Sequence, residues 1–281
     1  MPETVSRTSR TASTGCQAPA PALGARPRVP APSPYPRRFR SRIGVGAAGG
    51  FYPAPRRYDL FLCGSCPRSL RISITLDLLG LRDSVGTTLL ASPSATPDGY
   101  AALRRAYETT GYHYDGPLTA PALRDRWSGR IVSNHTSDIL RDLAGPLAGE
   151  GGAGPAALRP PHLIADIEAL RTLLDRDVTP GAQPSARRAA LGRLDRRLAR
   201  RPYALGEELT ASDVDLWVAL VHLDDPAELL GAPRLGEYVR RLGEHPAFRS
   251  AIQAPAGHAP ATGRSAGVMA SGVSVVSVAS C

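Results

Sequence analysis

The stretch Tyr58-Asp-Leu-Phe-Leu-Cys-Gly-Ser-Cys-Pro-Arg-Ser-Leu-Arg-Ile-Ser-Ile-Thr-Leu76 predicts a β-strand that leads directly into an amphipathic helix. Proline is well tolerated at the first helical position, because its missing N–H would have had no partner there. Pro67 therefore begins the helix and Cys66 takes the N-cap. At that position Cys66 faces unpaired N–H groups and the positive end of the helix dipole. Such a site favours the thiolate, which is the reactive form of cysteine, so Cys66 is a candidate nucleophile.

Two structural alternatives apply to these cysteines. A single cysteine is often only a small buried apolar residue. Cys63 and Cys66 also form a C-x-x-C spacing, which suggests either redox pairing or half of a zinc site. A second ligand pair for zinc is missing, because Cys16 and Cys281 lie near the ends and no His pair has ligand spacing. We therefore expect no metal. Cys63 could resolve a disulfide, but filling space at the strand end is the simpler role.

The composition supports a folded core with sizeable unstructured stretches. Hydrophobic residues make up 42% of the 281 residues, while Gly 28 and Pro 27 are high. The chain contains no lysine, so its net charge of +9 rests on arginine. The charge is concentrated in residues 4–44, which contain no Asp or Glu. Nucleic acid is the usual partner of such an arm, but aromatic interleaving and a binding fold are missing, so we expect no nucleic-acid partner.

The number of cysteines and the hydropathy of the chain indicate its cellular compartment. Four cysteines, two of them near the ends, do not form a disulfide framework. No window has the length and apolarity of a membrane helix, and the N-terminus lacks the hydrophobic segment of a secretory signal. Its Arg/Ser/Ala richness resembles an organelle transit peptide, but its prolines would break an amphipathic helix. We expect a cytoplasmic protein without a membrane partner.

The pattern up to residue 144 combines strands and helices. It predicts a strand over residues 57–62, a helix over 67–79 ended by Gly80, a strand over 85–90, a Tyr-bearing connection over 91–117, a β-hairpin turning at 126–129, and a helix capped by Ser133 or Asn134 that continues to about Leu143. In the first helix, Leu70, Ile74 and Leu78 recur at helical spacing and predict one buried face. The order β-α-β-loop-β-β-α is thioredoxin-like.

After a Gly/Ala-rich segment the pattern becomes wholly helical. It predicts helices over residues 160–176, 184–201, 211–223, 234–243 and 246–253. Thr210 and Asp213 suit a capping box at the start of the third of these helices. We expect an α/β plus all-α fold with these divisions: a disordered basic Pro/Ala/Arg-rich arm over 1–50, a thioredoxin-like domain over 51–144, a linker over 145–158, a helical C-terminal domain over 159–253 and a disordered tail over 254–281.

Several motifs in this order carry a family resemblance. They are Arg57–Leu62 followed by Cys66-Pro67 and Arg71; Thr119-Ala-Pro121; Ile131-Val-Ser-Asn-His-Thr-Ser-Asp-Ile139; Leu209-Thr-Ala-Ser-Asp213; and the ending Leu235–Phe248. Together they resemble the glutathione S-transferase superfamily and, more narrowly, its glutathionyl-hydroquinone reductase (Xi-class) branch, over about residues 40–253. The resemblance implies that the helical domain is a glutathione-transferase-type bundle and that the protein is a thiol transferase or reductase.

The resemblance also implies roles for individual residues. Cys66 matches the cysteine that attacks a glutathionyl thioether or disulfide, giving a mixed disulfide that a second thiol releases. Pro121 matches a cis-proline, and Ala120 before it pairs with the cysteinyl part of glutathione. His135 and Thr136 fall on the Glu-Ser pair that holds the γ-glutamyl end. Pro67 and Arg68 complete the expected thiol-binding residues.

The departures from the family pattern concern the co-substrate. His135 replaces a carboxylate that would pair with the glutathione α-amino group, and Arg68 replaces an aromatic residue. The Tyr-rich segment that contacts the quinol in the family is missing. A lysine-free, GC-rich composition suggests an actinobacterial host, and many such organisms use mycothiol, which has no γ-glutamyl amine. The expected co-substrate is therefore glutathione or another low-molecular-weight thiol such as mycothiol.

Two classes of function follow. In the first, the Cys66 thiolate attacks a sulfur of a small-molecule thiol conjugate, and the nearby Arg68 and Arg71 could support the thiolate, although ordinary surface charge is the simpler role for Arg71. In the second, the fold serves as a non-catalytic binding or assembly module. Because family members are commonly dimers, a homodimer is the expected assembly.

Overall fold

The computed structural model describes residues 37–44, 50–64, 66–149 and 158–253. Most of the predicted N-terminal arm, part of the predicted linker and the predicted tail, 254–281, lie outside the described residues. In the ranges that are described, no helix is both long and apolar enough to cross a membrane. The predicted boundaries between the α/β domain, the linker and the helical domain stay predictions.

A mixed sheet forms the centre of the N-terminal half. Its strands are β1 (Tyr58–Cys63), β2 (Val85–Leu90), β3 (Ala122–Asp125) and β4 (Ile131–Ser133), in the spatial order β2-β1-β3-β4. β2 is parallel to β1, whereas β3 is antiparallel to both β1 and β4. Gly129, with a φ of 73°, lies in the turn between β3 and β4, where a left-handed residue is needed. The predicted strands and hairpin are therefore confirmed.

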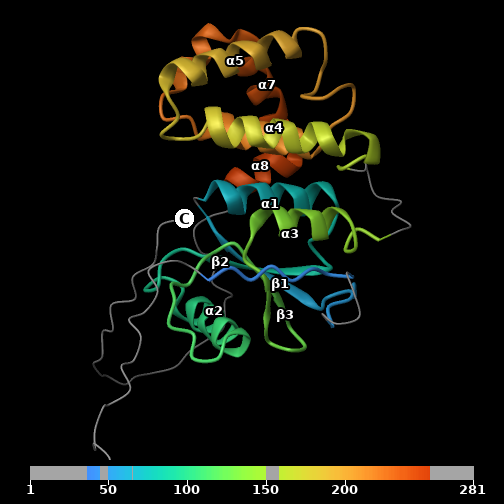
Figure 1. The fold of residues 1–281 in the computed structure, drawn as a ribbon, viewed down its shortest axis with the longest axis vertical. Helices are drawn as coiled ribbons and strands as arrows, with labels where there is room; N and C mark the ends of the chain where they lie inside the picture. Colours follow the sequence, from blue (N-terminus) through green and yellow to red (C-terminus); the bar gives the residue numbers. More distant parts are fainter. Residues whose placement is uncertain (1–36, 45–49, 65, 150–157, 254–281) are drawn as a thin grey trace, which may run out of the picture. The chain divides into compact units, whose positions relative to one another are not determined.

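Helices cover both faces of this sheet (Figure 1). α1 (Pro67–Leu78) and α3 (Thr136–Ala144) lie on one face, and α2 (Pro97–Thr110) lies on the other. The strand alternation of β1 explains this arrangement. Leu60 and Leu62 are buried in the cluster below α1 and α3, whereas Phe61 is buried with Leu103 and Tyr107 of α2. The order β-α-β-α-β-β-α confirms the thioredoxin-like class.

The Tyr-bearing connection over residues 91–117 was predicted as a loop, but it contains α2 (Pro97–Thr110). Pro97 occupies the first turn of α2, where proline is tolerated, and Leu103, Ala106 and Tyr107 share its buried face. Gly99 and the proline made this segment look like a loop. Tertiary burial of that face against β1 and Ile131 of β4 outweighs the weak local preference.

The predicted cap of α3 is also wrong, and the correction concerns the N-terminal arm. His135 is the N-cap. The Asn134 side chain instead accepts the Phe39 N–H (2.9 Å) and donates to the carbonyl of Arg37 (2.9 Å). Ile43 is fully buried. The expectation of disorder up to residue 50 thus fails for residues 37–44, because they pack along β4 and α3.

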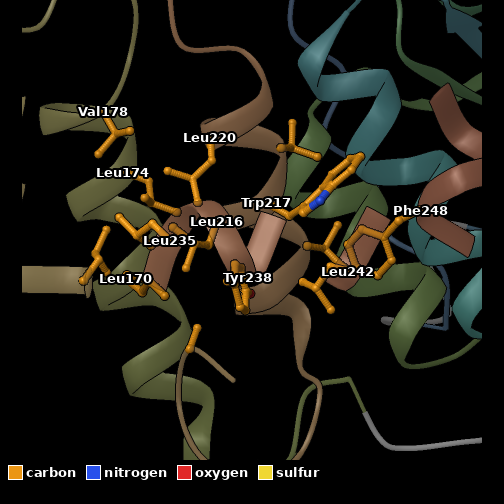
Figure 2. Close-up of a cluster of buried hydrophobic side chains, with 14 of the residues drawn as sticks. Leu170, Leu174, Val178, Leu216, Trp217, Leu220, Leu235, Tyr238, Leu242 and Phe248 are labelled. Atoms are coloured by element: carbon orange, nitrogen blue, oxygen red, sulfur yellow. The ribbon is translucent and has the colours of Figure 1, made fainter. Parts of the chain in front are cut away.

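The C-terminal half is helical, as predicted. It contains α4 (Ile164–Asp177), α5 (Pro184–Leu198), α6 (Ala211–Val221), α7 (Pro233–Glu244) and α8 (Pro246–Gln253), with 3-10 turns η1 (Pro161–Leu163) and η2 (Pro226–Gly231). Figure 2 shows the apolar cluster that these helices enclose. Trp217 packs edge-on against Phe248, with ring centroids 5.1 Å apart, which confirms Trp217 as a core residue.

α1 belongs to the core of both halves. The predicted face of Leu70, Ile74 and Leu78 packs into the helical cluster, and Ile72 and Leu76 on its opposite side pack onto the sheet. Figure 1 shows α1 between α8 and the sheet. A helix buried on two sides is fixed in place by both cores, so its N-terminus is held firmly.

The predicted capping box at α6 is present. Thr210 is the N-cap, and Asp213 accepts the Thr210 N–H (2.8 Å). Asp213, which is fully buried, also accepts the Ala204 N–H (2.7 Å) and the Tyr238 hydroxyl (2.7 Å). One carboxylate therefore connects the start of α6, the preceding loop and α7.

We expect Asp213→Ala to lower the free energy of unfolding by about 2–4 kcal/mol, since it removes the cap and leaves buried donors without an acceptor. Tyr238→Phe removes only one of these hydrogen bonds and should cost about 1 kcal/mol. Denaturant unfolding monitored by far-UV circular dichroism measures both. Equal costs for the two variants would contradict the central role of Asp213.

Candidate functional site

The topology of the sheet brings the start of β3 and the N-termini of α1 and α3 to one edge. β1 and β4 both run antiparallel to β3. The C-terminal ends of β1 and β4 therefore lie beside the start of β3. α1 follows β1 and α3 follows β4, so the N-termini of both helices lie at this edge. Backbone N–H groups at helix N-termini favour anions.

Cys66 lies at the N-terminus of α1 as predicted. It is the N-cap, with φ −90° and ψ 124°, and Pro67 follows at the first helical position. The Leu70 N–H donates to the Cys66 carbonyl (2.9 Å) and begins the helix. Cys66 is only 1% exposed. Its side chain therefore meets little solvent in this conformation.

Cys63 ends β1 and faces the other side of the sheet. Its side chain is half-buried and packs against the cluster that contains α2. Its N–H donates to Ser69 Oγ (2.9 Å), and its carbonyl accepts the Cys66 N–H (3.3 Å), so both ends of the short connection are held. This packing agrees with the space-filling role. Within the described ranges, no group of three or more His, Cys, Asp or Glu could hold a metal ion.

The Ala120–Pro121 peptide bond is cis. Phe61 pairs with Ala122 in the β1–β3 register, so the cis bond lies just beyond this pair, beside the end of β1 that leads to Cys66. Thr119, the residue before it, is held by the Tyr107 hydroxyl, which donates to the Thr119 carbonyl (3.0 Å). The cis-proline implied by the family resemblance is thus present.

A pocket of about 360 Å³ opens at this edge. It is lined by Arg38, Arg68, Arg71, Thr119, Asn134, His135, Thr136, Ser137, Leu140, Arg171 and Asp175. Of the predicted thiol-binding residues, Arg68, His135 and Thr136 line it. Cys66, Pro67, Ala120 and Pro121 do not, although Arg68 and Thr119 are their sequence neighbours. The structure therefore brings the predicted residues to one edge but not all into one cavity.

His135 lies in an ion-pair network at the start of α3. Its Nδ1 is 3.3 Å from Asp138 Oδ2, and Arg40 donates to both oxygens of Asp138 (2.7 and 3.0 Å). Burial lowers the pKa of His135, Asp138 raises it, and the Arg40 and Arg38 cations lower it, with a net decrease. Burial raises the pKa of Asp138, but the hydrogen bond from Arg40 and the charges nearby outweigh it and hold that pKa below its usual value.

Arg71 and Arg171 are two poorly exposed residues of the pocket lining. The interpretation of Arg71 as ordinary surface charge is wrong, because its side chain is 14% exposed and its Nε lies 3.4 Å from Asp215 Oδ1. Arg171 donates through Nε to Asp215 Oδ2 (2.9 Å), and its Nη2 is 2.8 Å from the same oxygen. Asp215 is 1% exposed. One buried carboxylate on α6 thus orients two arginines, one from α1 and one from α4.

Three residues at this site, Arg38, Arg171 and Asp215, were not among the residues predicted from the sequence. Arg38 lies in the segment that was expected to be disordered. Arg171 follows Ile167 by four residues and so occupies the apolar face of α4, and Asp215 lies between Val214 and Leu216. Arg171 and Asp215 could have been found from the sequence, because a charged residue at an apolar position of a helix needs a partner of opposite charge.

Comparisons with known proteins show which proteins this chain is similar to. A family model, the C-terminal domain of glutathione S-transferase, matches residues 162–241. The glutathionyl-hydroquinone reductase YqjG of Escherichia coli K12 is 27% identical over 217 residues, which are 64% of this chain and 64% of that protein, slightly under two thirds of its length. The glutathionyl-hydroquinone reductase PcpF of Sphingobium chlorophenolicum is 25% identical over 238 residues, which are 71% of this chain and 76% of that protein.

Solved structures show the same similarity. The Xi glutathione S-transferase of Phanerochaete chrysosporium is 28% identical, with a TM-score of 0.63, and the match covers 78% of this chain and 84% of that one. The glutathione-bound structure of YqjG has a TM-score of 0.61 at 24% identity, over 76% of this chain and 84% of that one, and supports the fold.

We expect Asp215→Asn to lower the free energy of unfolding by about 3 kcal/mol or more, because two poorly exposed arginines lose their shared counter-charge. Glu168 also contacts Arg171 but is partly exposed (34%), so Glu168→Gln should cost about 1 kcal/mol or less. Urea unfolding of both variants measures the difference. A cost for Asp215→Asn no larger than that for Glu168→Gln would show that Asp215 does not hold the arginines.

The His135 imidazole should titrate below pH 6.5, since its pKa is lowered in the folded protein. Because the unfolded chain then binds the proton more readily, the contribution of this group to stability is complete above about pH 6.5 and falls as the pH decreases towards the folded pKa. Arg38→Gln should move the midpoint upwards, and Arg37→Gln should leave it unchanged. NMR titration of the His135 ring measures each midpoint, and a wild-type value above 6.5 would refute the electrostatic account.

Proposed function

Because the chain belongs to the glutathione S-transferase superfamily and resembles its Xi-class, glutathionyl-hydroquinone reductase branch, we propose that it is a cysteine-dependent thiol transferase or reductase. The observation that carries the proposal is the position of Cys66 at the N-cap of α1, at the sheet edge with the cis Ala120–Pro121 bond and the arginine-lined pocket. A helix N-terminus and nearby cations favour the thiolate.

In the proposed reaction the Cys66 thiolate attacks the sulfur of a small-molecule thiol conjugate. With a disulfide conjugate, the new bond is the mixed disulfide of Cys66 and the small thiol, and the other half leaves as a thiolate. With an aryl thioether, the electron pair goes to the aryl carbon, which takes a proton. A second molecule of the small thiol then attacks the mixed disulfide, which regenerates Cys66 and releases the symmetric disulfide.

The pocket would hold the small thiol. His135 makes no side-chain capping hydrogen bond, so its side chain does not occupy the N–H groups of Thr136 and Ser137, which could donate to an anion. Thr136 and Arg68 line the pocket and could donate hydrogen bonds to a carboxylate. Glutathione is the co-substrate that the names of the relatives suggest, and mycothiol is the alternative. The protein would act in the reducing cytoplasm, with a homodimer as the expected assembly.

The burial of Cys66 supports a second candidate function. A thiol that is 1% exposed cannot meet a bulky conjugate unless the surrounding segment moves. If it stays buried, the protein is a non-catalytic binding or assembly module that uses the pocket alone. The reactivity of Cys66 distinguishes the two candidates.

We expect intact-mass analysis of a Cys16→Ser, Cys281→Ser background, after incubation with glutathione disulfide or mycothiol disulfide, to show one adduct per chain. Cys66→Ser should abolish the adduct because the attacking sulfur is removed, and the matched variant Cys63→Ser should retain it. Peptide mapping locates the modified residue. If the protein stays unmodified and Cys66 also resists iodoacetamide at neutral pH, the proposed enzyme activity is refuted. That result would favour the non-catalytic binding or assembly module.

A further inference from the structure

The pocket at the N-termini of α1 and α3 is strongly cationic. Arg38, Arg68, Arg71 and Arg171 line it, together with the single carboxylate of Asp175. Arg38 and Arg68 are exposed and have no ion-pair partner among the residues that the structure describes. The lining therefore offers charged donors to a ligand anion from more than one side.

The same lining offers little to a ligand cation. Asp175 Oδ1 is 3.8 Å from Arg71 Nη1, and its side chain is 59% exposed. The two buried carboxylates next to the lining are already shared, since Asp138 pairs with Arg40 and Asp215 pairs with Arg171. The one carboxylate of the lining is therefore largely in solvent, and the buried carboxylates nearby are already paired with arginines. An ammonium there would be partly desolvated beside like charges, which is unfavourable.

His135 does not make the pocket more favourable for a ligand cation. It lies at the N-cap of α3, where the dipole also disfavours a cation. Burial and the Arg40 and Arg38 cations lower the pKa of His135, so the ring is protonated less readily than a free imidazole. The carboxylate that faces it from its own helix is Asp138, and the cations that face it from the preceding segment are Arg40 and Arg38.

We propose that this pocket prefers, over glutathione with its α-ammonium group, a thiol whose end remote from the sulfur carries carboxylates but no ammonium group. The inference rests on the proposed function, because it names the class of thiol that the same site would use. Specificity then comes from rejection as well as attraction: guanidinium groups bind the carboxylates, and the same groups repel an amine.

A matched ligand pair tests the inference without any reaction at Cys66. One ligand is S-methylglutathione, and the other is the same molecule with the α-amino group replaced by hydrogen. Both have two carboxylates and a blocked sulfur, so they differ only in the ammonium. Isothermal titration calorimetry on the full-length wild-type protein at pH 7 should show that the des-amino ligand binds about tenfold more tightly, the size expected for one unfavourable charge contact.

Variants at position 135 reverse or preserve this preference. His135→Glu adds a carboxylate to the lining and should make S-methylglutathione the tighter ligand. His135→Gln is the matched control, since it is neutral and should keep the preference for the des-amino ligand. The wild-type comparison stands by itself if either variant fails to fold.

The outcomes separate the inference from the proposed function. Equal affinities, tighter binding of S-methylglutathione to the wild-type protein, or no binding of either ligand would overturn the inference. An adduct on Cys66 from any small-molecule disulfide supports the proposed function whichever ligand binds better. A tenfold preference without any Cys66 adduct would support the selectivity of the pocket and refute the proposed enzyme activity.

Discussion

A buried carboxylate with two arginines holds the site together. Asp215 on α6 contacts Arg71 on α1 and Arg171 on α4, and all three side chains have little contact with solvent. Buried charges are costly unless each is paired, so this contact strongly constrains how α1 meets the helical bundle. The two apolar cores hold α1 on both sides, and the ion pair adds an electrostatic contact between α1 and the bundle close to the N-terminus of α1, where Cys66 and Arg68 lie.

The directions of β1 and β4 determine which groups line the pocket. The N-termini of α1 and α3 lie at one edge of the sheet, since β1 and β4 run in the same direction. Arg38, from a segment that packs beside β4, and Arg171, from the helical bundle, add positive charge to that edge. The pocket is thus built by elements from both halves. Its positive character comes from helix ends and side chains together, which explains why an anionic ligand suits it.

The sequence predicted most elements, because their apolar residues repeat at the period of the element they form. It failed for α2, whose buried face is short and whose first turn contains proline and glycine. It also failed for residues 37–44, which lack a periodic pattern. Ile43 is buried and Asn134 binds the backbone of Phe39 only because α3 and β4 form a surface for that segment. Such long-range contacts leave no local signal in composition.

The sequence by itself determined the strand–Cys66–Pro67–helix junction, the capping box at Asp213 and the order of the four strands along the chain. These depend on local backbone preferences and on spacing within single elements. Only the tertiary structure decided that Cys66 is buried, that Arg71 faces Asp215 rather than solvent, and that Arg38 and Arg171 share a pocket with His135. Those facts depend on contacts between residues that are far apart in the chain, which leave no local pattern in the sequence.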